Sequence, residues 1–180
     1  SKVTVIEMVD RILPIEDEDV SKEALKLFRK QGIDFKPSHV TKAIECTDDG
    51  VKCLVAPAGD ENKTETIEGD VVLVAIGVQG RYDGLFADGL NIETDRGYLK
   101  VPHKDIESPT YETNISGVYA TGDIIGPPSL AHVASEEAMT CVERMAGHHT
   151  LGVDYKSIPG CTYTSPQIAS VGMTEQAARD

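Results

Sequence analysis

The sequence is short of positive charge. It carries 17 Lys and Arg against 30 Asp and Glu, which gives a formal net charge of −13 over 180 residues. An acidic chain repels DNA phosphates and anionic lipid headgroups, so this balance argues against binding to duplex DNA or to an anionic membrane. The sequence also lacks any run approaching the roughly 18 apolar residues that a membrane-spanning helix needs. We therefore expect neither a nucleic-acid partner nor a membrane partner.

Cysteine is scarce as well, with four residues in 180 and no Cys-x-x-Cys pair. That number is too small for a disulfide framework, and the chain opens with no secretory signal. We therefore expect a reducing compartment, by default cytoplasmic, with the mitochondrial matrix as an alternative that fits the same residues. Cys46 and Cys53 flank a predicted turn, where they either face each other across a hairpin or lie as two half-buried strand residues. We favour the second interpretation, because a free cysteine usually behaves as a small buried hydrophobe.

The chain also lacks the loosely held segments with which a domain usually begins and ends. Ser1 and Lys2 lead directly into the β-branched strand Val3–Glu7. At the other end, residues 174–180 are typical of the first turns of a helix that is capped by Thr174 and then cut short. We therefore expect the chain to be an internal fragment of a longer protein.

The first third of the sequence predicts a βαβ unit. After the strand at residues 3–7, the apolar residues Val20, Ala24, Leu27 and Phe28 recur on one face of a helix. Gly32 suits the left-handed position just past the end of that helix. A return strand then completes the unit.

A run of antiparallel strands follows. We expect strands at residues 39–46 and 51–55, joined by the turn Asp48-Asp49-Gly50, and a third short strand at 64–67. This β-meander leads into residues 71–77, where six apolar residues end in a glycine. Such a run is typical of a central parallel strand that is buried on both faces.

The rest of the chain again mixes strands and one long helix. We expect strands at residues 97–101, 117–121 and 161–163, and a helix at about 129–146. The stripe that this helix would bury consists of Ala134, Ala138, Cys141, Val142 and Met145. The alternation of strands and helices indicates an α/β architecture with open, doubly wound sheets.

Two candidate nucleotide-binding positions lie at strand ends in the first part of the chain. Glu7 ends the first strand, where a carboxylate can accept hydrogen bonds from both ribose hydroxyls and repel a 2′-phosphate. The alternative is a solvated acid at a strand end, because no Gly-x-Gly-x-x-Gly turn occurs anywhere in the chain. The second position is the run Ala75, Ile76 and Gly77, whose small residues either let a ligand approach the backbone or form a tight turn.

The richest candidate is the segment Thr121-Gly122-Asp123 with the helix start that follows it. Gly122 removes a side chain where a backbone can lie against a pyrophosphate, and Asp123 can bind a sugar hydroxyl. The helix that begins near Leu130 points free N–H groups at whatever lies beyond the strand. Alternatively, Asp123 is a turn former and His132 is an ordinary residue of the first helical turn.

These motifs together resemble a known family. Residues 115–124, followed by Leu130-Ala131-His132, closely resemble the second flavin motif of the pyridine nucleotide–disulfide oxidoreductases. Residues 5–8 resemble the ribose-binding strand of their NAD domain, and residues 163–175 resemble the opening of their dimerisation domain. The resemblance implies Rossmann-like FAD- and NAD(P)-binding domains with a β-meander, plus the start of an α+β dimerisation domain.

The resemblance also implies domain boundaries. Residues 1–79 would be the later part of the NAD-binding domain, and residues 80–149 would complete the FAD-binding domain. Residues 150–180 would begin the dimerisation domain, so the full-length protein would be a homodimer.

Residue roles follow from the same resemblance. Glu7 would bind the NAD ribose, Val40 would lie against the adenine, and residues 75–77 would line the nicotinamide side. On the flavin, Gly122 would lie at the pyrophosphate and Asp123 would bind the ribitol. The helix start at Leu130, with the backbone groups of Ala131 and His132, would stabilise the reduced, anionic isoalloxazine ring.

The run at residues 127–138 favours the branch of the family that reoxidises dihydrolipoyl groups with NAD. Its partners would be the lipoyl-bearing carrier domains of 2-oxo acid dehydrogenase complexes. The redox disulfide and the His–Glu base of that branch match no Cys or His here, so we expect the 180-residue chain alone to be inactive. The pair His148-His149 is favoured as a solvated loop over a catalytic or metal role.

Alternatives remain at the level of the whole protein. The family usually follows its Ala-Ile-Gly run with Arg and an Asn-containing loop, whereas this chain has Val78-Gln79-Gly80-Arg81-Tyr82. The rival interpretations are a mercuric reductase or transhydrogenase relative, and a non-catalytic nucleotide-binding module. A further possibility is that this piece does not fold in isolation.

Overall fold

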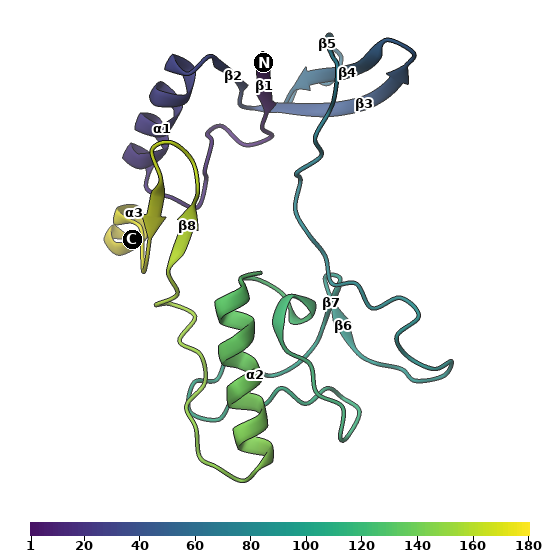
Figure 1. Ribbon diagram of the computed structural model, residues 1–180, viewed down its shortest axis with the longest axis vertical. Helices are drawn as coiled ribbons and strands as arrows, with labels where there is room; N and C mark the ends of the chain where they lie inside the picture. Colours follow the sequence, from purple (N-terminus) through teal and green to yellow (C-terminus); the bar gives the residue numbers. More distant parts are fainter. The chain divides into compact units, whose positions relative to one another are not determined.

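The computed structural model describes residues 1–180. The chain divides into two compact units, one formed by Ser1–Ala75 together with Gly160–Asp180, and the other by Ile76–Pro159. Each unit is described by itself (Figure 1). The boundaries expected from the sequence, after residues 79 and 149, are domain boundaries of a longer protein and stay predictions.

The first unit opens with the predicted βαβ arrangement. Strand β1 (Val3–Ile6) pairs in parallel with β2 (Ile33–Lys36), and helix α1 (Glu18–Lys30) connects them. The helix is amphipathic, and its buried positions lie three and four residues apart, as one helical face requires. These positions are Ser21, Ala24 and Phe28, which pack with Ile12 and half-buried Phe35.

Two sequence expectations about this βαβ unit need correction. Val20 was expected on the buried face of α1 but is 38 % exposed, because the buried stripe is centred on Ser21 and Ala24 instead. The first strand was expected to be buried, yet Val3 and Val5 are both exposed. Helix α1 packs against β2, and β1 pairs with no strand other than β2.

The β-meander forms as predicted. Strands β3 (His39–Thr47), β4 (Gly50–Pro57) and β5 (Glu65–Gly69) make an antiparallel three-stranded sheet in the order β3-β4-β5. The hairpin register places Cys46 opposite Val51 and Cys53 opposite Ile44. The two cysteines therefore do not face each other: Cys46 is exposed, Cys53 is buried, and both are free.

The apolar run Val71–Gly77 does not form the expected central strand. It has no regular structure, and its side chains are open to solvent, with Leu73 88 % and Ile76 94 % exposed. A strand needs a neighbour to satisfy its backbone groups. The meander ends at β5, and no strand in the chain pairs with this run. The composition suits a buried strand, but the sheet that would bury it is not formed by these 180 residues.

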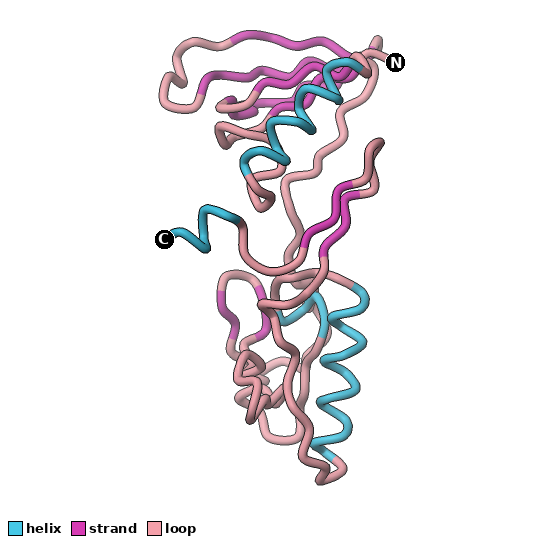
Figure 2. The backbone as a smooth tube through the Cα atoms, turned by 90° about the vertical axis from the view of Figure 1, so that its left-hand side faces the viewer, coloured by secondary structure: helices cyan, strands magenta, loops and turns pink.

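Residues 160–180 close the first unit. Strand β8 (Gly160–Thr162) pairs antiparallel with β9 (Ile168–Ser170), and the short helix α3 (Glu175–Arg179) follows (Figure 2). Thr174 caps α3 as predicted, since its Oγ1 accepts a hydrogen bond from the Ala177 N–H at 3.2 Å. The hydroxyl of Ser170 donates to Glu16 Oε1 at 3.2 Å, which ties the hairpin to the βαβ unit.

The second unit has little regular structure apart from one long helix. It contains β6 (Thr94–Asp95), β7 (Tyr98–Leu99), the 3-10 helix η1 (Gly122–Ile125) and α2 (Ala131–Met145). Figure 2 shows most of the remainder as loop. The core gathers side chains from β7, η1, α2 and the loops between them: Leu99, Val101, Tyr111, Ala120, Ile125 and Cys141.

Three predictions in this unit are wrong in part. Residues 117–121 form no strand, only an isolated bridge between Glu112 and Tyr119. The strand expected at 97–101 is reduced to Tyr98–Leu99. The helix is present, but Val142 and Met145 are exposed. Cys141 is buried as expected, and the rest of the buried face consists of Val133, Glu137 and Thr140.

The helices are also short on the scale of a bilayer. No helix is long and apolar enough to cross a membrane.

Candidate functional site

Glu7 lies directly after β1, held by its backbone between two other segments. Its N–H donates to the Lys36 carbonyl at 3.1 Å, and its carbonyl accepts from the His39 N–H at 2.9 Å. Its side chain turns back on the following loop, where Oε1 accepts from the Val9 N–H at 3.1 Å. The strand end therefore presents a half-buried carboxylate in a defined orientation.

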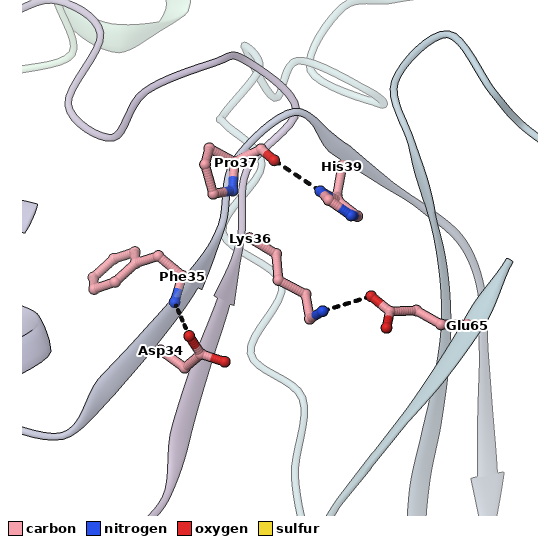
Figure 3. Close-up of polar contacts among 6 residues, drawn as sticks. All are labelled: Asp34, Phe35, Lys36, Pro37, His39 and Glu65. Carbon is pink, nitrogen blue, oxygen red and sulfur yellow. Dashed lines mark hydrogen bonds and ion pairs between the residues drawn. The ribbon is translucent and has the colours of Figure 1, made fainter. Parts of the chain in front are cut away.

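The segment that leads from β2 into β3 frames this strand end (Figure 3). The ammonium group of Lys36 pairs with Glu65 Oε1 at 2.6 Å, which joins β2 to the start of β5. His39 Nδ1 lies 2.7 Å from the Pro37 carbonyl. A carbonyl oxygen only accepts, so this ring nitrogen carries a proton and Nε2 is the acceptor in the neutral ring.

The neighbouring candidates in the first third of the chain differ in exposure. Val40 is half-buried on β3, opposite the fully buried Ala56 of β4. Residues 75–77 are exposed and without regular structure, and Gly77 has φ +119°. The unit boundary falls between Ala75 and Ile76. The structure therefore does not bring the run 75–77 to the edge of a sheet.

In the second unit, Gly122 begins η1 in a left-handed conformation with φ +78°. A Cβ at this position would lie 3.2 Å from the Ala134 Cβ on α2, so a side chain here would press on the helix. The Gly122 N–H donates to Glu137 Oε2, also on α2, at 2.7 Å. Asp123 follows with its side chain exposed. The turn is therefore attached to α2 immediately before the candidate carboxylate.

Glu137 is a buried carboxylate beside this turn that sequence reasoning missed. Its side chain is 3 % exposed, and its second oxygen, Oε1, accepts from the Tyr155 hydroxyl at 2.6 Å. Burial, together with the negative charge of Glu137, raises the pKa of Tyr155 well above its ordinary value. A charged residue on the expected polar face of a helix carries no sequence signal of burial. The two donors that bond to this buried carboxylate, the Gly122 N–H and the Tyr155 hydroxyl, lie 15 positions before it and 18 positions after it.

Two more aromatic groups, His103 and Tyr111, belong to the same cluster as Tyr155. The ring of His103 meets the Tyr155 ring edge-on, with centroids 5.3 Å apart, and stacks against Tyr111 at 6.4 Å. Burial, with a smaller contribution from the charge of Glu137, raises the pKa of the Tyr111 hydroxyl to about 12. His103 Nδ1 donates to the Val101 carbonyl at 2.9 Å, which fixes its ring. Glu137 thus sits in a packed, largely apolar setting.

The start of α2 offers free backbone donors. Leu130 is the N-cap residue in an extended conformation, and its apolar side chain makes no capping hydrogen bond. The N–H groups of the first turn have no intrahelical acceptor, and Ala131 and His132 at this turn are exposed. Because η1 packs against α2, the structure groups these residues with Gly122 and Asp123 in one unit. Glu7 and Val40 lie in the other unit.

The open grooves of the second unit lie elsewhere. One groove, of about 200 Å³, is lined by Tyr111, Tyr119, Cys141, Arg144 and neighbouring residues, none of which is a predicted site residue. No cluster of three or more His, Cys, Asp or Glu side chains has a metal-binding arrangement. His148 and His149 are exposed past Gly147.

The α/β fold, the carboxylate at the end of β1 and the η1 turn beside the start of α2 are typical of a nucleotide-binding protein. The family described as pyridine nucleotide-disulphide oxidoreductase matches residues 1–138. The chain belongs to this family, which confirms the resemblance and the α/β fold class.

The curated relatives are longer than this chain. The chain is 40 % identical over its whole length to mitochondrial dihydrolipoyl dehydrogenase of Pisum sativum and covers 34 % of it. It is 38 % identical over 99 % of its length to dihydrolipoyl dehydrogenase of Rhizobium etli, covering 36 %. It is also 40 % identical to leghemoglobin reductase of Glycine max, covering 33 %. The chain therefore spans about a third of the length of the curated relatives it matches, so it corresponds to a fragment of them.

Solved structures agree on the fold. LpdA from Mycobacterium tuberculosis matches 99 % of this chain with a TM-score of 0.83 and 26 % identity, over 36 % of its own length. The HOCl-induced flavoprotein disulfide reductase RclA from Escherichia coli matches with a TM-score of 0.82, over 99 % of this chain and 39 % of its own. At 23 % identity the second similarity shows the fold alone.

Proposed function

We propose that this chain supplies nucleotide-binding parts of a flavoenzyme that reoxidises dihydrolipoyl groups with NAD. The observation that carries the proposal is the 40 % identity to a dihydrolipoyl dehydrogenase along the whole chain. The arrangement around Gly122 and Asp123 supports it. A backbone turn, an exposed carboxylate and an uncapped helix start lie within one unit.

The residues of this unit fit FAD. The polar atoms on offer are the exposed carboxylate of Asp123 and the free N–H groups of Ala131 and His132. A carboxylate suits the ribitol hydroxyls, and backbone N–H groups at the positive end of α2, which starts after Leu130, suit a ring that gains negative charge. When bound, the flavin supplies two-electron transfer between a dithiol and a nicotinamide. The left-handed Gly122 lets the turn that bears Asp123 lie close to α2, where a side chain would meet Ala134.

The residues of the first unit fit NAD. The Glu7 carboxylate accepts hydrogen bonds from the ribose hydroxyls and repels a 2′-phosphate, which favours NAD over NADP. By the resemblance, Val40 would lie against the adenine, and residues 75–77, which the unit boundary divides, would line the nicotinamide side. These roles rest on the resemblance and on the defined orientation of the Glu7 side chain.

The partners follow from the same proposal. The whole protein is a homodimer that acts on lipoyl-bearing carrier domains of 2-oxo acid dehydrogenase complexes. The redox disulfide and the acid–base pair lie outside these 180 residues, so the chain alone is inactive. A cytoplasmic location, with the mitochondrial matrix as the alternative, stays a prediction.

The test is an assay of the full-length protein that contains this chain. We expect it to purify with flavin and to form NADH from dihydrolipoamide and NAD, with NADP a poor acceptor. Turnover of Hg(II), or transfer between NADPH and NAD, in place of dihydrolipoamide oxidation would favour a mercuric reductase or a transhydrogenase. Bound nucleotide without any turnover would favour a non-catalytic nucleotide-binding module.

A second candidate function comes from one comparison. The leghemoglobin reductase of Glycine max is as similar to the chain as the pea dihydrolipoyl dehydrogenase is. The same assay, run with ferric leghemoglobin as electron acceptor, tests whether the protein also reduces a ferric haem protein.

A further inference from the structure

Glu137 makes two hydrogen bonds from a nearly fully buried position. Oε2 accepts from the Gly122 N–H at 2.7 Å, and Oε1 accepts from the Tyr155 hydroxyl at 2.6 Å. No Lys, Arg or His pairs with it. A buried carboxylate without a cation depends on its hydrogen bonds to offset its desolvation. The two donors are therefore the partners that hold this group in place.

One of these donors belongs to the turn that bears the candidate flavin carboxylate. Gly122 directly precedes Asp123, so fixing the Thr121–Gly122 peptide orients the backbone from which the Asp123 side chain projects. Glycine at this position lets the turn lie close to α2, because a Cβ added to Gly122 would lie 3.2 Å from the Ala134 Cβ. The hydrogen bond to Glu137 prevents it from moving away. The turn is therefore held close to α2 by a hydrogen bond from its own backbone.

The other donor fixes the carboxylate itself. Tyr155 lies outside α2, and its ring packs edge-on against His103. Because burial and the charge of Glu137 both keep its hydroxyl protonated, Tyr155 remains a donor over the whole physiological range. Tyr155 therefore fixes one oxygen of the Glu137 carboxylate, and the other oxygen fixes the Gly122 N–H.

We propose that Glu137 is a positioning residue for the flavin, because its carboxylate fixes the Gly122–Asp123 turn in the orientation that binds the ribitol. The proposal rests on the proposed function, in which Asp123 binds FAD. Glu137 does not touch the cofactor. It acts by preorganising the turn, and a displacement of about 1 Å at such a position is enough to weaken a fixed polar contact strongly.

The test is titration of the full-length apoprotein with FAD, followed by flavin fluorescence. Glu137→Ala removes the acceptor of the Gly122 N–H, and we expect the Kd for FAD to rise about tenfold, the scale of one lost charge-assisted hydrogen bond. Glu137→Gln keeps one carbonyl oxygen for the Gly122 N–H and should recover most of the affinity. Tyr155→Phe leaves the bond to Gly122 intact and should change the Kd by less than about threefold.

A control variant separates positioning from stability. Cys141 lies one turn further along α2, is buried in the same core, and does not bond to the turn. Cys141→Ala should lower the melting temperature but leave the Kd for FAD unchanged. If Cys141→Ala and Glu137→Ala weaken FAD binding in proportion to their loss of melting temperature, the positioning role is wrong.

Two further readouts keep this inference separate from the proposed function. Asp123→Ala should weaken FAD binding; if it does not, the flavin assignment of this turn fails, whatever Glu137 does. Amide hydrogen exchange at Gly122 in the apoprotein does not involve flavin at all. We expect Glu137→Ala to speed this exchange at least about tenfold and Cys141→Ala to leave it unchanged. Unchanged protection of the Gly122 amide in Glu137→Ala would overturn the proposal.

Discussion

The rings of Phe28 and Phe35 stack with their centroids 6.1 Å apart and an interplanar angle of 23°. Phe28 comes from α1 and Phe35 from β2. This contact packs the helix onto the strand that follows it, at the centre of a core shared with Ile12 and Ala24. The βαβ unit that places Glu7 at a strand end therefore depends on one aromatic pair.

We expect Phe28→Ala to destabilise the protein by about 3 to 5 kcal/mol, because it removes the aromatic pair and leaves a cavity in a small core. Val20→Ala on the exposed side of the same helix should cost less than about 1 kcal/mol. Urea unfolding followed by circular dichroism measures both. Equal losses in the two variants would show that α1 does not pack through Phe28.

Gly122→Ala should weaken FAD binding as well as stability. The left-handed backbone costs any L residue about 1 to 2 kcal/mol, and the added Cβ meets Ala134 at 3.2 Å. Gly117→Ala is the matched control, because Gly117 has nearly the same φ of +79° but no atom within 4 Å of its Cβ position. Both variants should lose stability through the backbone, and only Gly122→Ala should raise the Kd for FAD. Comparable effects on FAD in both would rule out the contact with α2 as the cause.

Glu7→Gln should reduce the preference for NAD over NADP. The amide keeps an acceptor for the Val9 N–H but loses the negative charge that repels a 2′-phosphate. We expect NAD affinity to fall about tenfold or less, the scale of a charged hydrogen bond, while NADP affinity rises. Glu45→Gln, an exposed substitution on β3, is the control. Parallel falls in affinity for both nucleotides would count against a role in discrimination.

Stability should fall on the alkaline side because of buried tyrosines. Burial raises the pKa of Tyr111 from 10.0 to about 12, so the folded state holds this proton more tightly than the unfolded chain does. The contribution of protonated Tyr111 to the free energy of unfolding is complete below about pH 10. It is lost as the pH rises toward the pKa of Tyr111 in the folded protein, at up to about 1.4 kcal/mol per pH unit. Tyr111→Phe removes this group and should flatten the decline. Urea unfolding at several pH values, in both proteins, measures the difference; an identical slope would contradict the assignment.

Local signals were sufficient for several elements. The spacing of Ala24 and Phe28, with Gly32 after them, predicted α1 and its end, and Gly32 indeed has φ +86°. Thr174 predicted the cap of α3, and the turn at Gly50 predicted the β3–β4 hairpin. The flavin-motif residues predicted the family. Each of these depends on neighbours within a few positions in the chain or on a contiguous motif. Both kinds of signal can be recognised in the sequence without the tertiary structure.

The residues that were misjudged depend on distant partners. Val71–Gly77 has the composition of a central strand but is exposed, because a strand is defined by a neighbour that no nearby residue supplies. Val142 was expected to be buried and Glu137 was not noticed. In the structure Val142 is exposed and Glu137 is buried. Glu137 can be buried because it accepts hydrogen bonds from Gly122 and Tyr155, which lie 15 residues before it and 18 residues after it.

The sequence by itself determined the family, the α/β class, and the positions of the βαβ unit, the meander and the two longer helices. Only the tertiary structure decided which helix faces are buried, which strand candidates find partners, and which carboxylate holds the Gly122–Asp123 turn. The physical reason is that local propensity acts through the backbone of adjacent residues, whereas burial and hydrogen-bond pairing are settled by groups that meet after the chain has folded.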